Sequence, residues 1–197
     1  ALGAEGVLDN APLPPYHFPD ALPVTRHYGE AELRRAVFPP ELEWRAYWRQ
    51  LVDTWRTACD IAADHGLTVQ LHPALGVLAA NTDGFLLFAE AVDRPNLRFN
   101  FDTANMLVLK ENLPLSLLRL QDYVDYIHLS DNRGDRVEHL AIGDGNIDWP
   151  AFFDTVQRID FRGRFGIDIG GAESPVENLE EAYRRAARFV MERGRGI

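Results

Sequence analysis

Cysteine, long apolar runs and basic charge are all scarce in this sequence of 197 residues. Its one cysteine, Cys59, cannot form a disulfide within the chain, so nothing in the sequence points to an oxidising compartment. No stretch approaches the roughly 18 consecutive apolar residues that a membrane-spanning helix needs, and no basic-then-apolar signal segment opens the chain. We therefore expect a cytoplasmic protein with no membrane partner.

Acidic residues outnumber basic ones. The chain has 30 Asp and Glu against 20 Lys and Arg, which gives a formal net charge of -10 at pH 7. Binding to nucleic acid depends on clustered basic residues, so this balance argues against a nucleic-acid partner and favours a small-molecule ligand. The apolar fraction of 46% is that of an ordinary folded protein, and the sequence leaves homo-oligomer formation open.

Short apolar runs alternate with longer stretches of helical periodicity. The predicted strands cover residues 6–8, 68–71, 97–101, 126–129 and 165–169. The predicted helices cover residues 41–65, 84–92, 114–123, 149–158 and 176–193. This alternation is typical of βα units around a parallel sheet and predicts an α/β fold. No linker or long repeat divides the chain, so we expect a single domain over residues 1–197.

Local signals mark some ends of these elements. Asp83 and Ser174 are the expected N-caps of their helices, and Gly66 is expected to end the first long helix in a left-handed conformation. Residues 10–40 contain seven of the 12 prolines and little periodicity. We expect this segment to be a βα loop that folds over a site.

Polar side chains with metal-binding chemistry lie at the ends of four successive predicted strands. They are His72, Asp102, His128 and Asp168. In a parallel sheet the carboxyl ends of the strands form the ligand-binding edge, and two imidazoles with two carboxylates suit Mn, Fe, Co or Zn. Each residue also has a structural reading as a hydrogen-bonded core histidine or a helix-capping aspartate. Two carboxylates close together are costly without a cation between them, which favours the metal site.

Three motifs carry a resemblance to a known family. They are Phe-Asp-Thr-Ala-Asn at residues 101–105, Tyr-Ile-His-Leu-Ser-Asp at residues 126–131, and Ile-Gly-Asp-Gly-Asn-Ile-Asp-Trp at residues 142–149. In this order and spacing the chain resembles the xylose isomerase-like superfamily of sugar phosphate isomerases and epimerases. The resemblance implies a partial (β/α)8 TIM barrel with about five βα units, strands four to eight of the family. Residues 1–4 resemble the helix end before strand four, so the first three units are expected to be missing.

The resemblance also implies roles for single residues. Asp102 and His128 match metal ligands of the family, and Asp131 matches a residue that supports the site, where we expect it to orient His128. In sugar-active members the fifth and eighth strands end in glutamates that bind the metal and move a proton. His72 and Asp168 stand at those positions here, so we expect them to be both metal ligands and catalytic residues.

The implied activity is that of a sugar or polyol isomerase or epimerase. A divalent metal ion (Mn, Co, Fe, Zn or Mg) would assist removal of a proton next to a carbonyl, and the reaction would pass through an enediolate. Asn105, Arg133 and His139 are the expected substrate-binding residues. Two alternatives stay open: a keto-polyol dehydratase resembling inosose dehydratase, and a sugar-binding barrel whose catalytic site is degenerate.

Overall fold

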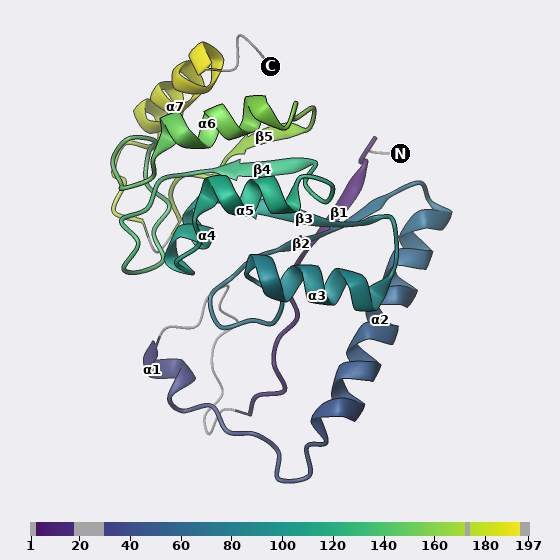
Figure 1. Cartoon of the computed structure of the whole chain (residues 1–197). Helices are drawn as coiled ribbons and strands as arrows, with labels where there is room; N and C mark the ends of the chain where they lie inside the picture. Colours follow the sequence, from purple (N-terminus) through teal and green to yellow (C-terminus); the bar gives the residue numbers. More distant parts are fainter. Residues whose placement is uncertain (1–2, 18–29, 172–173, 194–197) are drawn as a thin grey trace. The chain divides into compact units, whose positions relative to one another are not determined.

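The computed structural model describes residues 3–17, 30–171 and 174–193 (Figure 1). The strands are β1 (Gly6–Asn10), β2 (Thr68–His72), β3 (Leu97–Asp102), β4 (Tyr126–Leu129) and β5 (Arg164–Ile167). The helices are α1 (Glu30–Leu33), α2 (Trp44–Asp64), α3 (Thr82–Val92), α4 (Thr103–Val108), α5 (Leu113–Leu120), α6 (Trp149–Arg158) and α7 (Leu179–Arg193). The predicted α/β fold with parallel strands is confirmed.

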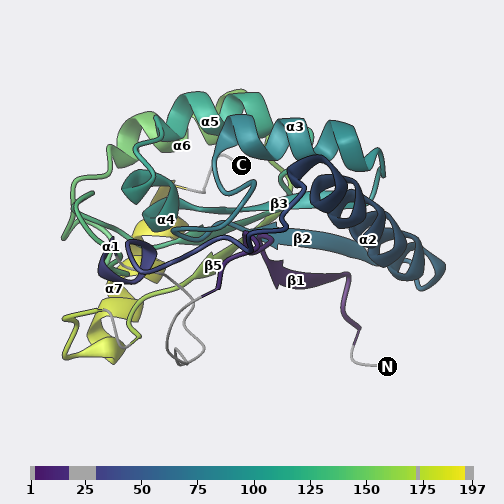
Figure 2. The same ribbon diagram turned by 90° about the horizontal axis from the view of Figure 1, so that it is seen from below.

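Two compact units make up the chain, residues Ala1–Arg98 and Phe99–Ile197. In the first unit β1 pairs in parallel with β2, and Asn10 lies opposite His72. Helix α2 packs against β2 and α3, and Figure 2 shows both helices on the same side of β2. The division falls inside β3, and the single-domain organisation stays a prediction.

Helix α2 buries one face of its 21 residues. Val52, Trp55 and Cys59 recur every three or four residues, as the helical period requires, and all three are buried. The Trp55 ring packs edge-on against Phe88 of α3, with their centroids 5.7 Å apart. Gly66 follows the helix with a φ of +68°, which confirms its predicted role as the left-handed residue beyond the C-cap.

In the second unit β4 pairs in parallel with both β3 and β5. Helix α5 packs against α6, and α7 packs against β5. The Phe153 ring of α6 lies 6.0 Å from Phe165 of β5 and 5.8 Å from Phe189 of α7, so aromatic side chains fill the space between helices and sheet. These rings form part of the core between α6, α7 and β5.

Some local expectations were wrong. Asn81, and not Asp83, caps α3, because its side-chain oxygen accepts the Gly84 N–H at 2.8 Å. Ser174 does not cap α7: that helix begins at Leu179, and its first turn is bonded to the Asn178 side chain. Helices α1 and α4 were not predicted. Of the expected loop over residues 10–40, residues 18–29 lie outside the described part. None of the helices in the described ranges is long and apolar enough to cross a membrane.

Candidate metal centre

The carboxyl ends of β3, β4 and β5 bring three of the predicted ligands to one edge of the second unit. Asp102 is the last residue of β3 and lies opposite His128 of β4 in the parallel register. Asp168 directly follows β5, and its backbone N–H donates to the Leu129 carbonyl at 3.1 Å. Side chains alternate along a strand, so these three side chains point to the same face of the sheet.

Asp102 caps a helix, and its role as a metal ligand stays a prediction. Its Oδ1 accepts the Asn105 N–H at 2.8 Å and caps α4, and the side chain is completely buried. A carboxylate oxygen of Asp102 also lies within 4.8 Å of a ring nitrogen of His128. Asn105, an expected substrate residue, lies in the first turn of α4 and is 2% exposed. The capping bond therefore orients the carboxylate without removing it from the candidate site.

His139 joins this edge from the long loop after β4. Its Nδ1 lies 3.0 Å from Ser130 Oγ and 3.6 Å from Asp168 Oδ2, and the side chain is 3% exposed. Ligand atoms of Asp102, His139 and Asp168 all lie within 4.8 Å of one another. The sequence assigned His139 to the substrate, whereas the geometry makes it equally fit to hold a metal.

Hydrogen bonds fix the main chain at His139 and at the end of β4. The His139 carbonyl accepts the Gly170 N–H at 3.0 Å and the Ser174 hydroxyl at 2.9 Å. Thr103 Oγ1 donates to the Ser130 carbonyl at 2.7 Å and accepts the Ser130 N–H at 3.1 Å, which ties the ends of β3 and β4 together. Ser130 contacts His139 and was missed from the sequence, although a residue directly after a strand is the position to inspect.

Asp131 organises the loop that carries His139. Its two oxygens accept four hydrogen bonds at 2.8–3.2 Å, from the N–H groups of Asn132, Gly143 and Ile147 and from the indole of Trp149. The residue is completely buried, and Asp131 forms an isolated antiparallel bridge with Leu140. The structure thus shows Asp131 as the anchor of this loop, and an orienting contact with His128 stays a prediction.

The glycine-rich motif at residues 142–149 surrounds the Asp131 carboxylate and donates hydrogen bonds to it. Gly143 has a φ of +91°, a conformation that favours glycine, and presents its N–H to Asp131. A Cβ on Gly145 would overlap Asp131 Oδ1 and lie 2.5 Å from the Asn132 carbonyl oxygen. Asp148 caps α6 by accepting the Ala151 N–H at 3.1 Å. The motif therefore closes the loop around a buried carboxylate.

The ring of Tyr126 packs against the ring of His128, two residues further along β4. The two rings meet edge to face with centroids 5.1 Å apart. Gly166 lies opposite His128 in the register with β5, and a Cβ there would overlap the Tyr126 hydroxyl. The missing side chain on β5 therefore provides the space that the tyrosine ring fills.

Arg133 belongs to a cluster of charged residues on the same loop, together with Arg136 and Glu138. Its Nη1 donates to Glu138 Oε1 at 2.9 Å, and Arg136 donates to the same oxygen from Nη2 at 2.8 Å. Glu138 is completely buried, and its hydrogen bond to Arg136 raises the pKa of that guanidinium. This ion pair fixes the guanidinium of Arg133, and its contact with substrate stays a prediction.

His72 belongs to the first unit. It is the last residue of β2, is 1% exposed and lies opposite Asn10 of β1. Asn10 ends β1 on the same face and was not singled out from the sequence. The shared ligand set of His72 with the residues of the second unit stays a prediction.

The donor set of the second unit fits a divalent metal. Asp102, His128, His139 and Asp168 offer two carboxylates and two imidazoles at one edge, and the first three are mostly or fully withdrawn from solvent. Two carboxylates this close repel each other unless a cation or a proton lies between them. Mixed nitrogen and oxygen ligands suit Mn, Fe, Co and Zn.

A family comparison decides the fold. Residues 21–193 match the family model described as xylose isomerase-like TIM barrel. The chain belongs to this family. Its five parallel strands are accordingly part of a (β/α)8 barrel, which confirms the fold expected from the three motifs.

Among curated proteins, an L-ribulose 3-epimerase from Methylomonas sp. (strain DH-1) is 30% identical over 109 residues, 53% of this chain and 36% of that protein. An inosose dehydratase from Clostridium beijerinckii is 22% identical over 165 residues, 74% of this chain and 54% of that protein. A solved D-allulose 3-epimerase from Methylomonas sp. is similar at a TM-score of 0.64 and 22% identity, covering 79% of this chain and 58% of that one. The same epimerase is also solved in complex with D-allulose. This chain thus spans about half the length of the relatives it matches.

Proposed function

We propose that the protein is a metal-dependent sugar or polyol isomerase or epimerase that removes a proton next to a carbonyl and passes through an enediolate. The observation that carries the proposal is the Asp102, His139 and Asp168 group, whose ligand atoms lie within 4.8 Å of one another beside His128. Family membership supports it, and two similar proteins are 3-epimerases, one of them solved with D-allulose.

Each candidate site residue at the strand ends of the second unit has a defined task in this proposal. Asp102, His128 and Asp168 would hold the ion, and His139 would hold either the ion or the substrate. When bound, a divalent cation stabilises negative charge that develops on the substrate oxygens. Ser130 Oγ lies 3.0 Å from His139 Nδ1 and would hold the imidazole in one orientation. Asn105, Arg133 and His139 would orient the substrate.

Proton transfer falls to Asp168 and His72 in this proposal. Asp168 is 33% exposed at its side chain and would be accessible to a substrate, whereas the Asp102 carboxylate is completely buried. His72, at the end of β2, is the second proton carrier. The buried thiol of Cys59 is compatible with the cytoplasmic location that we propose for the protein.

A second candidate function is a keto-polyol dehydratase. It is favoured by the inosose dehydratase that aligns with 74% of this chain. Proton removal next to a carbonyl is common to both reactions, and the dehydratase then expels a hydroxide as water.

Solvent deuterium exchange tests the proposal. The protein, stripped of metal and reloaded with Mn²⁺ or Co²⁺, is incubated with D-allulose and other ketoses and with keto-polyols in D₂O. We expect deuterium at the carbon next to the carbonyl, and Asp168→Asn should slow its uptake strongly. Asp144→Asn, on an exposed loop carboxylate, is the matched control.

The products separate the two reactions. An epimerised product containing deuterium supports the proposed function, and a product that has lost water supports the dehydratase. A protein that binds metal and ketose yet incorporates no deuterium would overturn both and identify a sugar-binding barrel.

A further inference from the structure

Lack of space, and not backbone conformation, accounts for the glycine at position 166 of β5. The φ of Gly166 lies outside the left-handed region, so other residues could adopt this backbone conformation. A Cβ at this position would overlap the Tyr126 hydroxyl and would lie 2.8 and 2.9 Å from the ring carbons Cε1 and Cζ. Real Cβ atoms avoid contacts under 3.0 Å, so the Tyr126 ring in its present position requires a glycine on the neighbouring strand.

The Tyr126 ring lies in the row of side chains that precedes the candidate metal ligands. Tyr126 and His128 are two residues apart on β4, so both side chains point to the same face of the sheet. In the register with β3, Tyr126 lies opposite Asn100 and His128 lies opposite Asp102. The tyrosine and imidazole rings meet at 79°, with their centroids 5.1 Å apart. Between Gly166 on β5 and the imidazole on its own strand, the ring has little room to turn.

Different kinds of contact orient the candidate ligands of the second unit. The Asn105 N–H donates to Asp102, and Ser130 Oγ lies 3.0 Å from His139 Nδ1. His128 packs against an aromatic ring. The χ2 torsion of histidine is broad, so an imidazole without a packed neighbour samples several orientations. Ordering a ligand at the moment of binding costs affinity, and a neighbour that orders it beforehand raises affinity.

We propose that Tyr126 is the positioning residue of His128 and thereby a determinant of metal affinity. Seated in the space beside Gly166, the ring keeps the imidazole turned toward Asp102, whose carboxylate oxygen lies within 4.8 Å of a His128 ring nitrogen. The ring itself carries this role, because the contact with His128 is one between rings and phenylalanine would provide the same contact. The inference rests on the proposed metal-dependent function and adds a residue that sets how tightly the ion is held.

Calorimetric titration of the metal-free protein with Mn²⁺ tests the role of the ring. Tyr126→Phe keeps the ring and should bind the ion as the wild type does. Tyr126→Leu has no ring to pack against the imidazole, and its Kd should rise about tenfold. With Co²⁺ bound, Tyr126→Leu should change the visible absorption band, which depends on ligand geometry, and Tyr126→Phe should keep it. Tyr123→Leu removes a half-buried tyrosine before the amino end of β4, and this matched control should keep wild-type affinity.

A double-mutant cycle tests the space beside the ring. Gly166→Ala should raise the Kd for Mn²⁺ about tenfold, because the new methyl group displaces the Tyr126 ring. Added to Tyr126→Leu, the same substitution should raise the Kd by less than about twofold more, since no ring is left to displace. Urea titration confirms that each variant is folded, and Gly166→Ala carries the test if Tyr126→Leu does not fold.

Three results would overturn the inference. They are wild-type affinity in folded Tyr126→Leu or Gly166→Ala, equal losses in Tyr126→Phe and Tyr126→Leu, and losses that multiply in the double variant. Each of them, found with a wild type that binds Mn²⁺, leaves the proposed function standing. A wild type that binds no Mn²⁺ would overturn the proposed function as well.

Discussion

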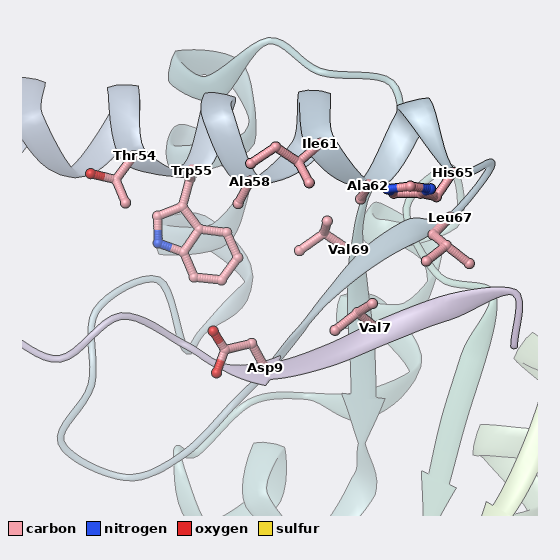
Figure 3. A pocket seen from close by; sticks show the side chains of 10 residues that line it. All are labelled: Val7, Asp9, Thr54, Trp55, Ala58, Ile61, Ala62, His65, Leu67 and Val69. Carbon is pink, nitrogen blue, oxygen red and sulfur yellow. The ribbon is translucent and has the colours of Figure 1, made fainter.

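The strand-end edge of the second unit and the open groove between β1 and α2 of the first unit depart from the usual protein surface in opposite ways. At the edge, polar groups are buried: Asp102 and Asp131 are completely inaccessible, and Asp131 accepts four hydrogen bonds. At the groove, which has a volume of about 430 Å³, apolar groups are exposed, with Val7 and Ile61 about half accessible (Figure 3). Buried carboxylates are costly unless hydrogen bonds or a cation compensate their charge, whereas exposed apolar side chains mark a surface suited to contact with another apolar surface. The comparison predicts that loss of a charge at the strand-end edge strongly reduces activity or stability, whereas loss of a charge in the first unit has little effect.

Removing the charge of Asp102 should have the largest effect. Asn accepts the same capping bond, so Asp102→Asn should leave the midpoint of urea unfolding close to that of the wild type. Loss of a ligand charge should lower metal-dependent deuterium exchange on the order of 100-fold or more. Asp83→Asn, in the exposed first turn of α3, is the control and should keep wild-type exchange. A fully active Asp102→Asn variant would remove the reason to regard this edge as a site.

Removing the Asp131 carboxylate should have the largest effect on stability. Asp131→Ala leaves buried donors of the loop without acceptors, which should cost about 3–5 kcal/mol of unfolding free energy in urea titrations. Asp148→Ala removes only a helix cap and should cost about 1 kcal/mol. Similar losses in both variants would show that the anchor is no more than a surface turn.

Substitution of two glycines of the motif distinguishes the cost of a steric overlap from the cost of an unfavourable backbone conformation. Gly145→Ala should cost about 2 kcal/mol, because the new methyl group overlaps Asp131 and forces the loop to move. Gly143→Ala meets no atom within 4 Å but keeps a φ of +91°, and should cost about 1 kcal/mol. Only Gly145→Ala should also weaken metal binding in a calorimetric titration. Weakened binding in Gly143→Ala alone would contradict the assignment.

Charge on the helix side of the first unit should matter least. Arg94 donates two hydrogen bonds to Asp60, at 2.6 and 3.1 Å, and these bonds lower the pKa of that carboxyl. A lowered folded-state pKa stabilises the protein above the unfolded-state value of about 3.9, and this contribution is lost as the pH falls through the lower folded-state value. The small difference in melting temperature between wild type and Asp60→Asn should therefore be present at pH 7 and vanish at the acid end. A difference that grows on acidification would contradict this.

The strands and the candidate ligands at their ends were predictable because a parallel strand has a recognisable local sequence pattern. A short apolar run followed by a polar residue is visible for Asp102 and for Asp168, and a register of adjacent strands then brings the side chains to one edge. Helix α4 was missed because it has only six residues and begins directly after β3, with a strand residue as its cap.

The place of His139 was not predictable from local pattern. It depends on a loop that folds back through the Asp131 and Leu140 bridge, and the hydrogen bonds of that bridge join residues nine apart. The role of Gly145 likewise depends on the close approach of the chain to Asp131, and spacing along the sequence does not show such an approach. Cap assignment failed at Asp83 for a smaller reason, since two residues before it Asn81 offers an equally good acceptor.

Calorimetric titration with Mn²⁺ tests the central assignment most directly. The wild-type chain should bind the ion, and His128→Gln should raise the dissociation constant by about 10–100-fold. His65→Gln, on an exposed histidine at the end of α2, should bind as the wild type does. Wild-type affinity in the His128→Gln variant, or no binding by the wild type, would contradict a metal centre at Asp102, His128 and Asp168.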